Sequence, residues 1–259
     1  MKQRFNYKYV FGPVYSWRLG ISLGIDPVPG NLKYCSFNCV YCQLGKTAGF
    51  CRRRRIFVPT AKIIGELASL APLKVDYITF SGRGEPTLAK NLGQIIEGIR
   101  KIRREKIAVI TNASLLGQKE VRRDLAAADV VLAKLDAYDE KSFREINRPG
   151  AVHFKSILQG IKKFRREYKG RLVLQIMFIK ENKDRAAELA RLARAIRPDE
   201  VQLNTPLRKS PARPLSRPAM RRIKHAFKAF RVRMVYDTPR RRVRPLNQKS
   251  TIGRHGLKK

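Results

Sequence analysis

Acidic residues are scarce in this sequence. Of its 259 residues, 20 are Asp or Glu and 57 are Lys or Arg, which gives a formal net charge of +37. A chain with this charge attracts polyanions over long range, and nucleic acid is the obvious candidate partner. The alternative is a generally basic, solvated surface, because Lys and Arg are spread along nearly every expected helix. Charge alone leaves both interpretations open.

Long apolar runs are also missing. No stretch of about 18 or more uncharged apolar residues occurs, and the polar, basic segment Met1–Tyr9 has no apolar segment behind it. We therefore expect no membrane span, no secretory signal, no membrane partner and a cytoplasmic location. Because 43% of the residues are hydrophobic, the chain can still bury a substantial core, which excludes a disordered polypeptide.

Cysteine and histidine are rare. The four cysteines all fall between positions 35 and 51, and in a reducing compartment such clustering predicts a metal or redox site rather than a disulfide framework. The three histidines, His153, His225 and His255, show no ligand spacing. We expect them to be non-catalytic.

Apolar periodicity alternates between strand-like and helix-like segments. Strands are expected at Gly20–Asp26, Tyr77–Ser81, Ile107–Thr111, Val130–Leu135, Leu172–Ile179 and Val201–Asn204. Apolar residues at spacings of three and four mark helical faces within residues 63–70, 92–99, 154–161 and 189–196. This α/β alternation, about six units long, predicts a parallel sheet covered by helices, as an open or partial (β/α) barrel or a doubly wound sheet.

The carboxyl ends of the expected strands turn polar or glycine-rich. These ends are Ser81–Pro86, Thr111–Ser114, Asp136, Lys180–Asn182 and Asn204–Pro206, with Gln175 inside the fifth strand. Catalytic groups of parallel α/β folds gather where strand ends meet their loops. We therefore expect these residues to converge on one rim.

Beyond Pro206 the composition shifts. Residues 205–259 carry 18 Lys or Arg and a single acid, Asp237, and repeated prolines interrupt regular structure. We expect residues 1–208 to form the main domain and residues 209–259 a basic C-terminal extension. Within the extension we expect a helix near Ala219–Phe230, a strand near Val232–Tyr236 and a mobile, partly disordered tail over Pro239–Lys259.

The cysteine segment is the strongest motif. Cys35, Cys39 and Cys42 have the spacing C-x-x-x-C-x-x-C in a stretch rich in Gly, Asn and Pro. Close spacing on a flexible backbone lets three thiolates surround one compact inorganic centre, and soft thiolate ligands favour iron–sulfur clusters or zinc. Three ligands would leave one iron of a four-iron cluster open to a substrate or cofactor.

This spacing, with the aromatic Tyr41 directly before the last cysteine, resembles the signature of the radical S-adenosylmethionine (SAM) superfamily. The resemblance implies that Cys35, Cys39 and Cys42 ligate a 4Fe-4S cluster whose fourth iron binds the amino and carboxylate groups of SAM. It further implies reductive cleavage of SAM to methionine and a 5′-deoxyadenosyl radical, with an electron donor such as flavodoxin or ferredoxin. The fold it implies is a partial (β/α)6 barrel with a basic C-terminal extension.

A second motif follows the second expected strand. Gly82-Arg83-Gly84-Glu85-Pro86 resembles the Gly-Gly-Glu-type segment of the family, whose backbone contacts the SAM amino group, although Arg83 separates the glycines. Glycine there permits a close backbone approach to a ligand. The cofactor-binding residues implied by the resemblance are Gly82, Gly84, Glu85, Asn112, Asp136 and Asn204, the last near adenine.

Four further segments resemble the subgroup that includes the wyosine tRNA-modification synthetases. They are Phe11–Gly20, Leu135–Ala137, Ile146–Pro149 and Gln202–Pro206. The resemblance implies tRNA or another RNA as a candidate substrate. Those synthetases carry additional cysteines ahead of the motif for a second cluster, whereas none precedes Cys35 here, which argues against wyosine synthesis itself.

A zinc site is the main alternative. Cys51 with the three motif cysteines would close a tetrahedral structural site, which would make the chain a zinc-stabilised nucleic-acid-binding module without catalysis. That interpretation leaves the polar rim unexplained. The run Arg52–Arg55, directly after the cysteines, either contacts RNA phosphates or is solvated.

Overall fold

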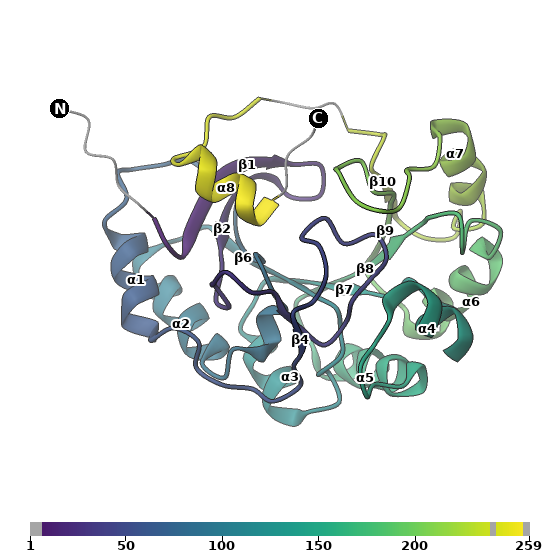
Figure 1. The fold of residues 1–259 in the computed structure, drawn as a ribbon, viewed down its shortest axis with the longest axis horizontal. Helices are drawn as coiled ribbons and strands as arrows, with labels where there is room; N and C mark the ends of the chain where they lie inside the picture. The colour runs from purple at the N-terminus through teal and green to yellow at the C-terminus, as the bar shows by residue number, and fades with distance from the viewer. Residues whose placement is uncertain (1–6, 239–241, 256–259) are drawn as a thin grey trace.

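The computed structural model describes residues 7–238 and 242–255 and is built around one curled sheet. The strand order is β1-β2-β5-β6-β7-β8-β9-β10. The strands are β1 (Val10–Ser16), β2 (Gly20–Ile25), β5 (Tyr77–Phe80), β6 (Lys106–Thr111), β7 (Val130–Lys134), β8 (Arg171–Met177), β9 (Glu200–Asn204) and β10 (Val232–Met234). Neighbours from β2 to β10 are parallel, whereas β1 runs antiparallel to β2. The sheet forms a half-barrel (Figure 1).

Helices cover the convex face of the sheet (Figure 1). They are α1 (Thr60–Ala68), α2 (Leu92–Ile102), α3 (Lys119–Ala126), α4 (Glu140–Asn147), α5 (Phe154–Glu167) and α6 (Ala186–Ile196). α7 (Arg217–His225) follows β9, and α8 (Gln248–His255), the last helix, lies against β1 instead. A short 3-10 helix, η1 (Pro86–Leu88), and a small parallel sheet of β3 (Tyr34–Cys35) and β4 (Gly49–Phe50) complete the described elements.

The two faces of the sheet belong to separate apolar clusters. In β8, Leu172, Leu174 and Ile176 join the large core with the helices, whereas Val173 joins a small cluster with Leu19 and residues of β6 and β7. Side chains alternate between faces along a strand, so odd-numbered positions of β8 face the inside of the half-barrel. Gln175 is therefore an inward-facing polar residue.

The half-barrel confirms the expected fold class and decides against a doubly wound sheet. All six strands expected from periodicity are present. The sequence reading missed β1, because Gly12 and Pro13 interrupt its apolar pattern and a bulge shifts its register between Phe11 and Val14.

The C-terminal segment adds to both edges of the sheet. β10 pairs in parallel with β9, in the region where a strand was expected. α8 lies within the stretch predicted to be a mobile tail and packs against β1, where Thr251 Oγ1 accepts a hydrogen bond from Gly12 N at 2.9 Å. Residues 239–241 and 256–259 of that stretch lie outside the described residues. The domain boundary at residue 208 stays a prediction.

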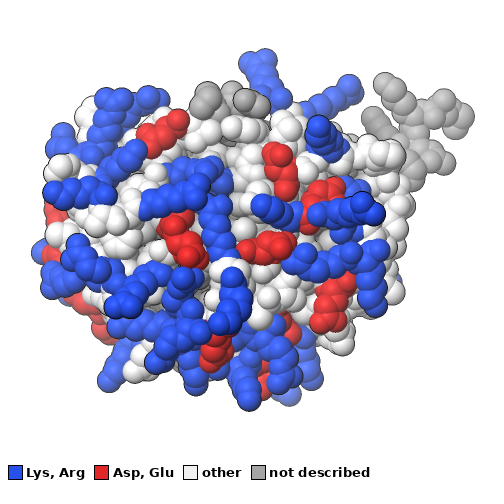
Figure 2. Space-filling view, turned by 180° about the vertical axis from the view of Figure 1, so that it is seen from behind, with Lys and Arg blue, Asp and Glu red and all other residues white. Residues whose placement is uncertain are grey.

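Positive charge is distributed over the molecule. Figure 2 shows Lys and Arg over much of the face seen from behind, with fewer acidic side chains between them. Within the described part of the chain, no helix combines the length and apolar character needed to span a membrane.

Candidate active site

The cysteine segment lies across the concave side of the half-barrel (Figure 1). Its backbone pairs with the α4–α5 connection: Asn38 N donates to Asn147 O at 3.1 Å and to Arg148 O at 3.0 Å, and Val40 N donates to Ile146 O at 3.0 Å. Gly150 N donates in turn to Ser36 O at 3.2 Å. The loop that carries the thiols is therefore held on a defined backbone edge.

Capping of α4 sets the position of this edge. Asp139 is the N-cap, and its carboxylate accepts from Ser142 N at 2.7 Å while Ser142 Oγ accepts from Asp139 N at 3.1 Å, a capping box. The helix ends at Arg148 in the left-handed region, with φ of 43°. Asn147, the last helical residue, is thereby directed inward and is 3% exposed.

Two asparagine amides hold two of the thiols. Asn112 Nδ2 lies 3.4 Å from Cys35 Sγ, and Asn147 Nδ2 lies 3.4 Å from Cys39 Sγ. Burial, with Glu85 and Cys39 nearby, raises the pKa of Cys35 to about 12, and burial next to Asp136 raises the pKa of Cys39. Both thiols are therefore protonated in the metal-free protein at neutral pH, so metal binding would release protons.

The third cysteine of the motif follows one turn later. Cys42 N donates to Cys39 O at 3.0 Å, and Cys51 N donates to Cys35 O at 3.1 Å. Among residues 7–238 and 242–255, no three His, Cys, Asp or Glu side chains stand close enough together to hold a metal ion. The donor set nevertheless fits an iron–sulfur cluster in its chemistry, because three soft ligands share one short loop.

The glycine-rich turn after β5 packs directly on the cysteine segment. Glu85 N donates to Tyr34 O at 3.0 Å, and a Cβ on Gly84 would lie 2.4 Å from the same carbonyl oxygen. Gly82 has φ of 132°, and a Cβ there would lie 2.4 Å from the Asp26 carboxyl carbon. Neighbouring atoms therefore leave no room for a side chain at either glycine. The turn adjoins Cys35, as the sequence predicts.

The Glu85 carboxylate is fully engaged by the protein. It accepts from Thr111 Oγ1 at 2.6 Å, Thr87 Oγ1 at 2.7 Å and Asn112 N at 2.8 Å. These bonds join the ends of β5 and β6. Burial raises the pKa of Glu85 despite these donors. Any contact of this turn with SAM would therefore come from its backbone rather than from the carboxylate.

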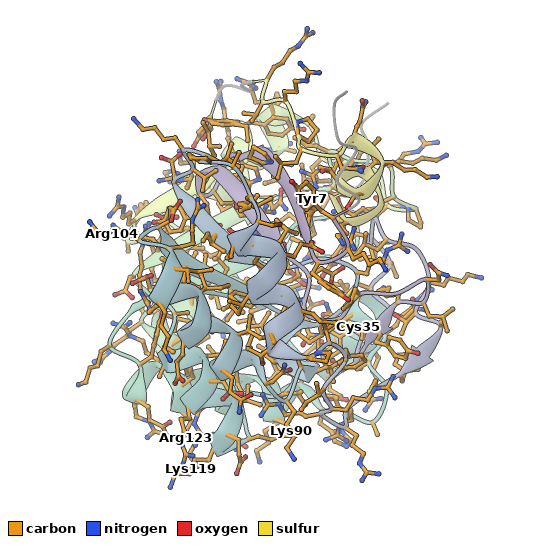
Figure 3. All side chains as sticks on the ribbon, turned by 90° about the vertical axis from the view of Figure 1, so that its left-hand side faces the viewer. Tyr7, Cys35, Lys90, Arg104, Lys119 and Arg123 are labelled. Carbon is orange, nitrogen blue, oxygen red and sulfur yellow. The ribbon has the colours of Figure 1, made fainter. Side chains whose placement is uncertain are left out.

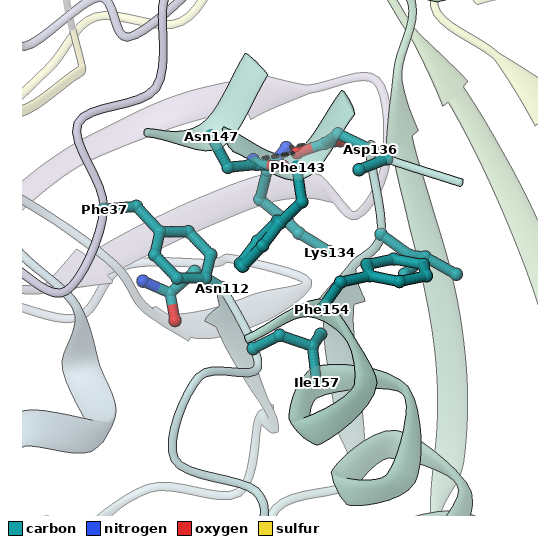
Figure 4. Close-up of a pocket in the computed structure, with 10 residues that line it drawn as sticks. Phe37, Asn112, Lys134, Asp136, Phe143, Asn147, Phe154 and Ile157 are labelled. Atoms are coloured by element: carbon teal, nitrogen blue, oxygen red, sulfur yellow. Dashed lines mark hydrogen bonds and ion pairs between the residues drawn. The ribbon is translucent and has the colours of Figure 1, made fainter. Parts of the chain in front are cut away.

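Asp136 fastens the cysteine loop to β8 and to the end of α4. Its Oδ1 accepts from Met177 N at 2.7 Å, and its Oδ2 accepts from the Tyr41 hydroxyl and from Asn147 Nδ2 at 3.1 Å. Figure 4 shows Asn147 and Asp136 pointing toward one another beside a small pocket. On its other side, the Phe37 and Phe143 rings meet edge to face at 5.2 Å. Apolar packing and a buried polar network therefore hold the same loop.

The predicted residues thus form two groups. Cys35, Glu85 and Asn112 surround one end of the cysteine segment, and Cys39 and Asp136 surround the next turn. Asn204 ends β9 farther along the rim, where its carbonyl oxygen accepts from Phe178 N at 2.7 Å. Figure 3 shows Cys35 toward the middle of the molecule and Arg104, Lys119 and Arg123 at its periphery. The cofactor-binding role of each residue stays a prediction.

Comparison with known proteins decides the family. Residues 32–193 match the Radical SAM superfamily. The UPF0026 protein of Synechocystis sp. is 49% identical over 207 residues, which are 78% of this chain and 77% of that protein. The chain belongs to the radical SAM superfamily.

Solved structures of radical SAM proteins share the fold. TYW1 with a lysine-pyruvate adduct bound has a TM-score of 0.61 at 17% identity, covering 81% of this chain and 74% of that chain. SuiB of Streptococcus suis bound to S-adenosylmethionine has a TM-score of 0.61 at 16% identity, covering 78% and 50%. Membership of the radical SAM superfamily implies SAM and a 4Fe-4S cluster, and it makes the chain an enzyme rather than a zinc-stabilised binding module.

Two residues of this radical SAM site were not predicted from the sequence. Asn147 lies in the segment Ile146–Pro149, and Tyr41 enters the cysteine motif only as the aromatic residue before Cys42. The hydrogen-bond partners of both residues lie far away along the chain, so residue spacing in the sequence does not indicate these contacts. The sequence predicts Arg54 to be a phosphate contact or a solvated side chain, yet it is largely buried and donates to Thr87 O at 2.9 Å and Ala89 O at 3.0 Å.

Replacing Asn147 should loosen the cysteine loop of the radical SAM enzyme. Asn147→Ala removes the donor to Cys39 Sγ and to the buried Asp136 carboxylate, so we expect a loss of about 1–3 kcal/mol in the free energy of unfolding. Denaturant titration measures this loss. Asn31→Ala, at an exposed position, should change the value by less than about 0.5 kcal/mol. Equal stability of both variants would show that the network contributes nothing.

Proposed function

We propose that this radical SAM enzyme modifies tRNA or another RNA in the cytoplasm, with flavodoxin or ferredoxin as electron donor. Cys35, Cys39 and Cys42 would hold the 4Fe-4S cluster. The turn with Gly82, Gly84 and Glu85, together with Asn112, Asp136 and Asn204, would surround SAM. With both groups bound, reductive cleavage of SAM supplies a 5′-deoxyadenosyl radical that abstracts a hydrogen atom from the substrate.

The protein residues around the proposed site would orient the cluster ligands and shield them from water. Asn112 and Asn147 place amide donors on two sulfurs, and such hydrogen bonds tune the reduction potential of a thiolate-ligated cluster. The Asp136 carboxylate holds the cysteine loop through the Tyr41 hydroxyl, and the Glu85 carboxylate joins the glycine turn to the end of β6. The apolar packing of Phe37 on Phe143 keeps water from one side. These contacts support a preorganised site.

A basic groove beside the glycine turn carries the RNA proposal. The groove has a volume of about 600 Å³ and runs between α8, residues 7–9 and Arg83. Among the described residues that line it, four are Lys or Arg and none is acidic: Lys8, Arg83, Lys249 and Arg254. Tyr7, Tyr9 and Phe57 add aromatic surface. Sites for single-stranded nucleic acid typically place cations that bind phosphates next to aromatic rings on which bases stack.

An anaerobic assay tests the proposed function. Protein reconstituted with iron and sulfide should convert SAM to 5′-deoxyadenosine when a reductant is supplied, and bulk tRNA should raise the rate or yield. Quantification of 5′-deoxyadenosine, with metal analysis of the same sample, gives the result. Stoichiometric zinc without iron would contradict the enzyme. SAM cleavage that tRNA and total RNA leave unchanged would contradict the substrate class.

A single lysine tests the groove. Lys249→Ala should weaken RNA binding and reduce the slope of log K against log salt by about 1, because one phosphate contact is lost. Deleting the whole C-terminal segment is less informative, since Arg254 Nε forms a buried ion pair with Asp26 at 2.8 Å. Lys163→Ala on α5 is the matched control and should leave the slope unchanged. Equal effects of both changes would mean that RNA binds through diffuse charge alone.

A further inference from the structure

A loop crosses the inside of the half-barrel. Residues 17–19 connect β1 to β2, and Arg233 Nη1 in β10 donates to the carbonyl oxygens of Trp17 and Arg18 at 3.3 and 3.2 Å. Leu19 packs in the inner apolar cluster with Leu132 and Val173. Figure 1 shows this hairpin reaching from β1 toward β10. The connection therefore joins the two edges of the open sheet and places Arg18 within it.

The Arg18 guanidinium has no acidic partner among residues 7–238 and 242–255. With its amide oxygen turned toward the guanidinium, Gln175 accepts from Arg18 Nη2 at 3.1 Å. The Arg18 guanidinium also stacks over the Trp17 ring at 4.8 Å. The inward-facing acid on β9, Glu200, is held instead by Arg171, Arg231 and Arg233. Among the described residues, the hydrogen-bond and ring partners of this cation are therefore neutral.

The surroundings of Arg18 make this arrangement costly. Burial, together with the positive charge of Arg208, lowers the pKa of Arg18 to about 9. The group still carries its charge at neutral pH, next to a second guanidinium. A poorly solvated cation without a counter-ion destabilises the folded protein, and an anion bound to Arg18 would offset that cost.

A buried carbonyl oxygen without a hydrogen-bond partner among the described residues lies near Arg18. Gln202 on β9 is aligned with Gln175 on β8 in the parallel register, so both side chains face the inside of the half-barrel. Gln202 is 1% exposed, and its Nε2 donates to Glu200 Oε1 at 2.7 Å. Its Oε1 has no hydrogen-bond partner in the part of the chain that the structure describes. A buried carbonyl oxygen in this state is matched by a ligand that donates a hydrogen bond.

We propose that Arg18 and Gln202 bind the substrate inside the half-barrel, Arg18 through an oxyanion of a carboxylate or phosphate ester and Gln202 through a neighbouring hydroxyl or amine. Arg208 links this position to the cysteine segment, because its Nη1 lies 3.4 Å from Gln43 Oε1, next to Cys42. The inference rests on the proposed function, since it names the chemical group that the same radical SAM site would take.

Anion titration of the reconstituted holoenzyme with SAM, anaerobic and without reductant, tests the site. Inorganic phosphate and acetate are added in separate series at constant ionic strength, and the unfolding temperature gives an apparent Kd. Arg18→Gln should weaken binding of the preferred anion about tenfold, the loss of one charge-assisted contact. Without added anion, Arg18→Gln should have an unfolding temperature no lower than that of the wild type. Arg166→Gln, exposed on α5, should bind as the wild type does.

Gln175→Glu provides an independent check. Its carboxylate would neutralise Arg18 from within the protein, so the response to phosphate and acetate should fall about as far as in Arg18→Gln. Unaltered anion affinity in both variants would overturn the inference. It would also be overturned if neither anion raised the unfolding temperature of the wild type and Arg18→Gln unfolded at a lower temperature than the wild type. A response to phosphate alone assigns a phosphate ester, and a response to acetate alone assigns a carboxylate. Failure of wild-type SAM cleavage in the separate reductive assay would instead refute the proposed function.

Discussion

Cys35→Ala is expected to lower the yield of 5′-deoxyadenosine from SAM by more than about 100-fold, because even an outer partner of a metal ligand can contribute 10- to 100-fold. Cys35 is the thiol nearest the glycine turn, since Glu85 N binds the carbonyl oxygen of the preceding residue. Iron content per chain and the product yield are measured on the same anaerobic sample. The loss should appear in both.

Cys51→Ala is the matched control for this experiment. Cys51 lies beside Cys35 through its backbone, but among the described residues its Sγ donates a hydrogen bond only to the Arg53 carbonyl oxygen, at 3.4 Å. We expect iron content and SAM cleavage close to wild type. Equal loss in the two variants would favour the four-thiolate zinc site, and full activity of Cys35→Ala would refute the assignment of the cluster ligands.

Gly84→Ala should have the second-largest effect. The new Cβ would lie 2.4 Å from Tyr34 O, so the turn must move away from the cysteine segment. Overpacking of this kind costs about 1–3 kcal/mol in stability, and here it also separates the glycine turn from Cys35. We expect an earlier denaturation midpoint and a lower SAM affinity, measured by urea titration and equilibrium binding.

Gly65→Ala distinguishes this steric effect from glycine replacement in general. Gly65 is exposed in α1, and a Cβ there meets nothing within 4 Å. Alanine in a helix should stabilise by up to about 1 kcal/mol. If Gly84→Ala matched Gly65→Ala in midpoint and SAM affinity, the close approach of the turn to Tyr34 would have no role in the site.

The fold was predictable because its strands are buried on both faces and read as continuous apolar runs, as in Val130–Ala133. The adjacency of Gly84 to Cys35 was also predictable, since both follow parallel strands on one rim. The pairing of Asn147 with Cys39 was not, because it depends on where α4 ends, and that is set by the capping box and by the left-handed Arg148. The position of Arg18 escaped sequence reasoning because it depends on β1, which the Gly12-Pro13 interruption concealed.

The pairing of the cysteine loop with the α4–α5 connection has a consequence for synthesis. Asn147 is 108 residues from Cys39 along the chain, so the three thiols leave the ribosome long before their backbone partner exists. Closing such a distant contact is slow compared with forming local helices. The backbone edge that holds the nascent cysteines is therefore missing until more than half of the polypeptide has been made. We expect cluster delivery to be a late step in the maturation of this protein.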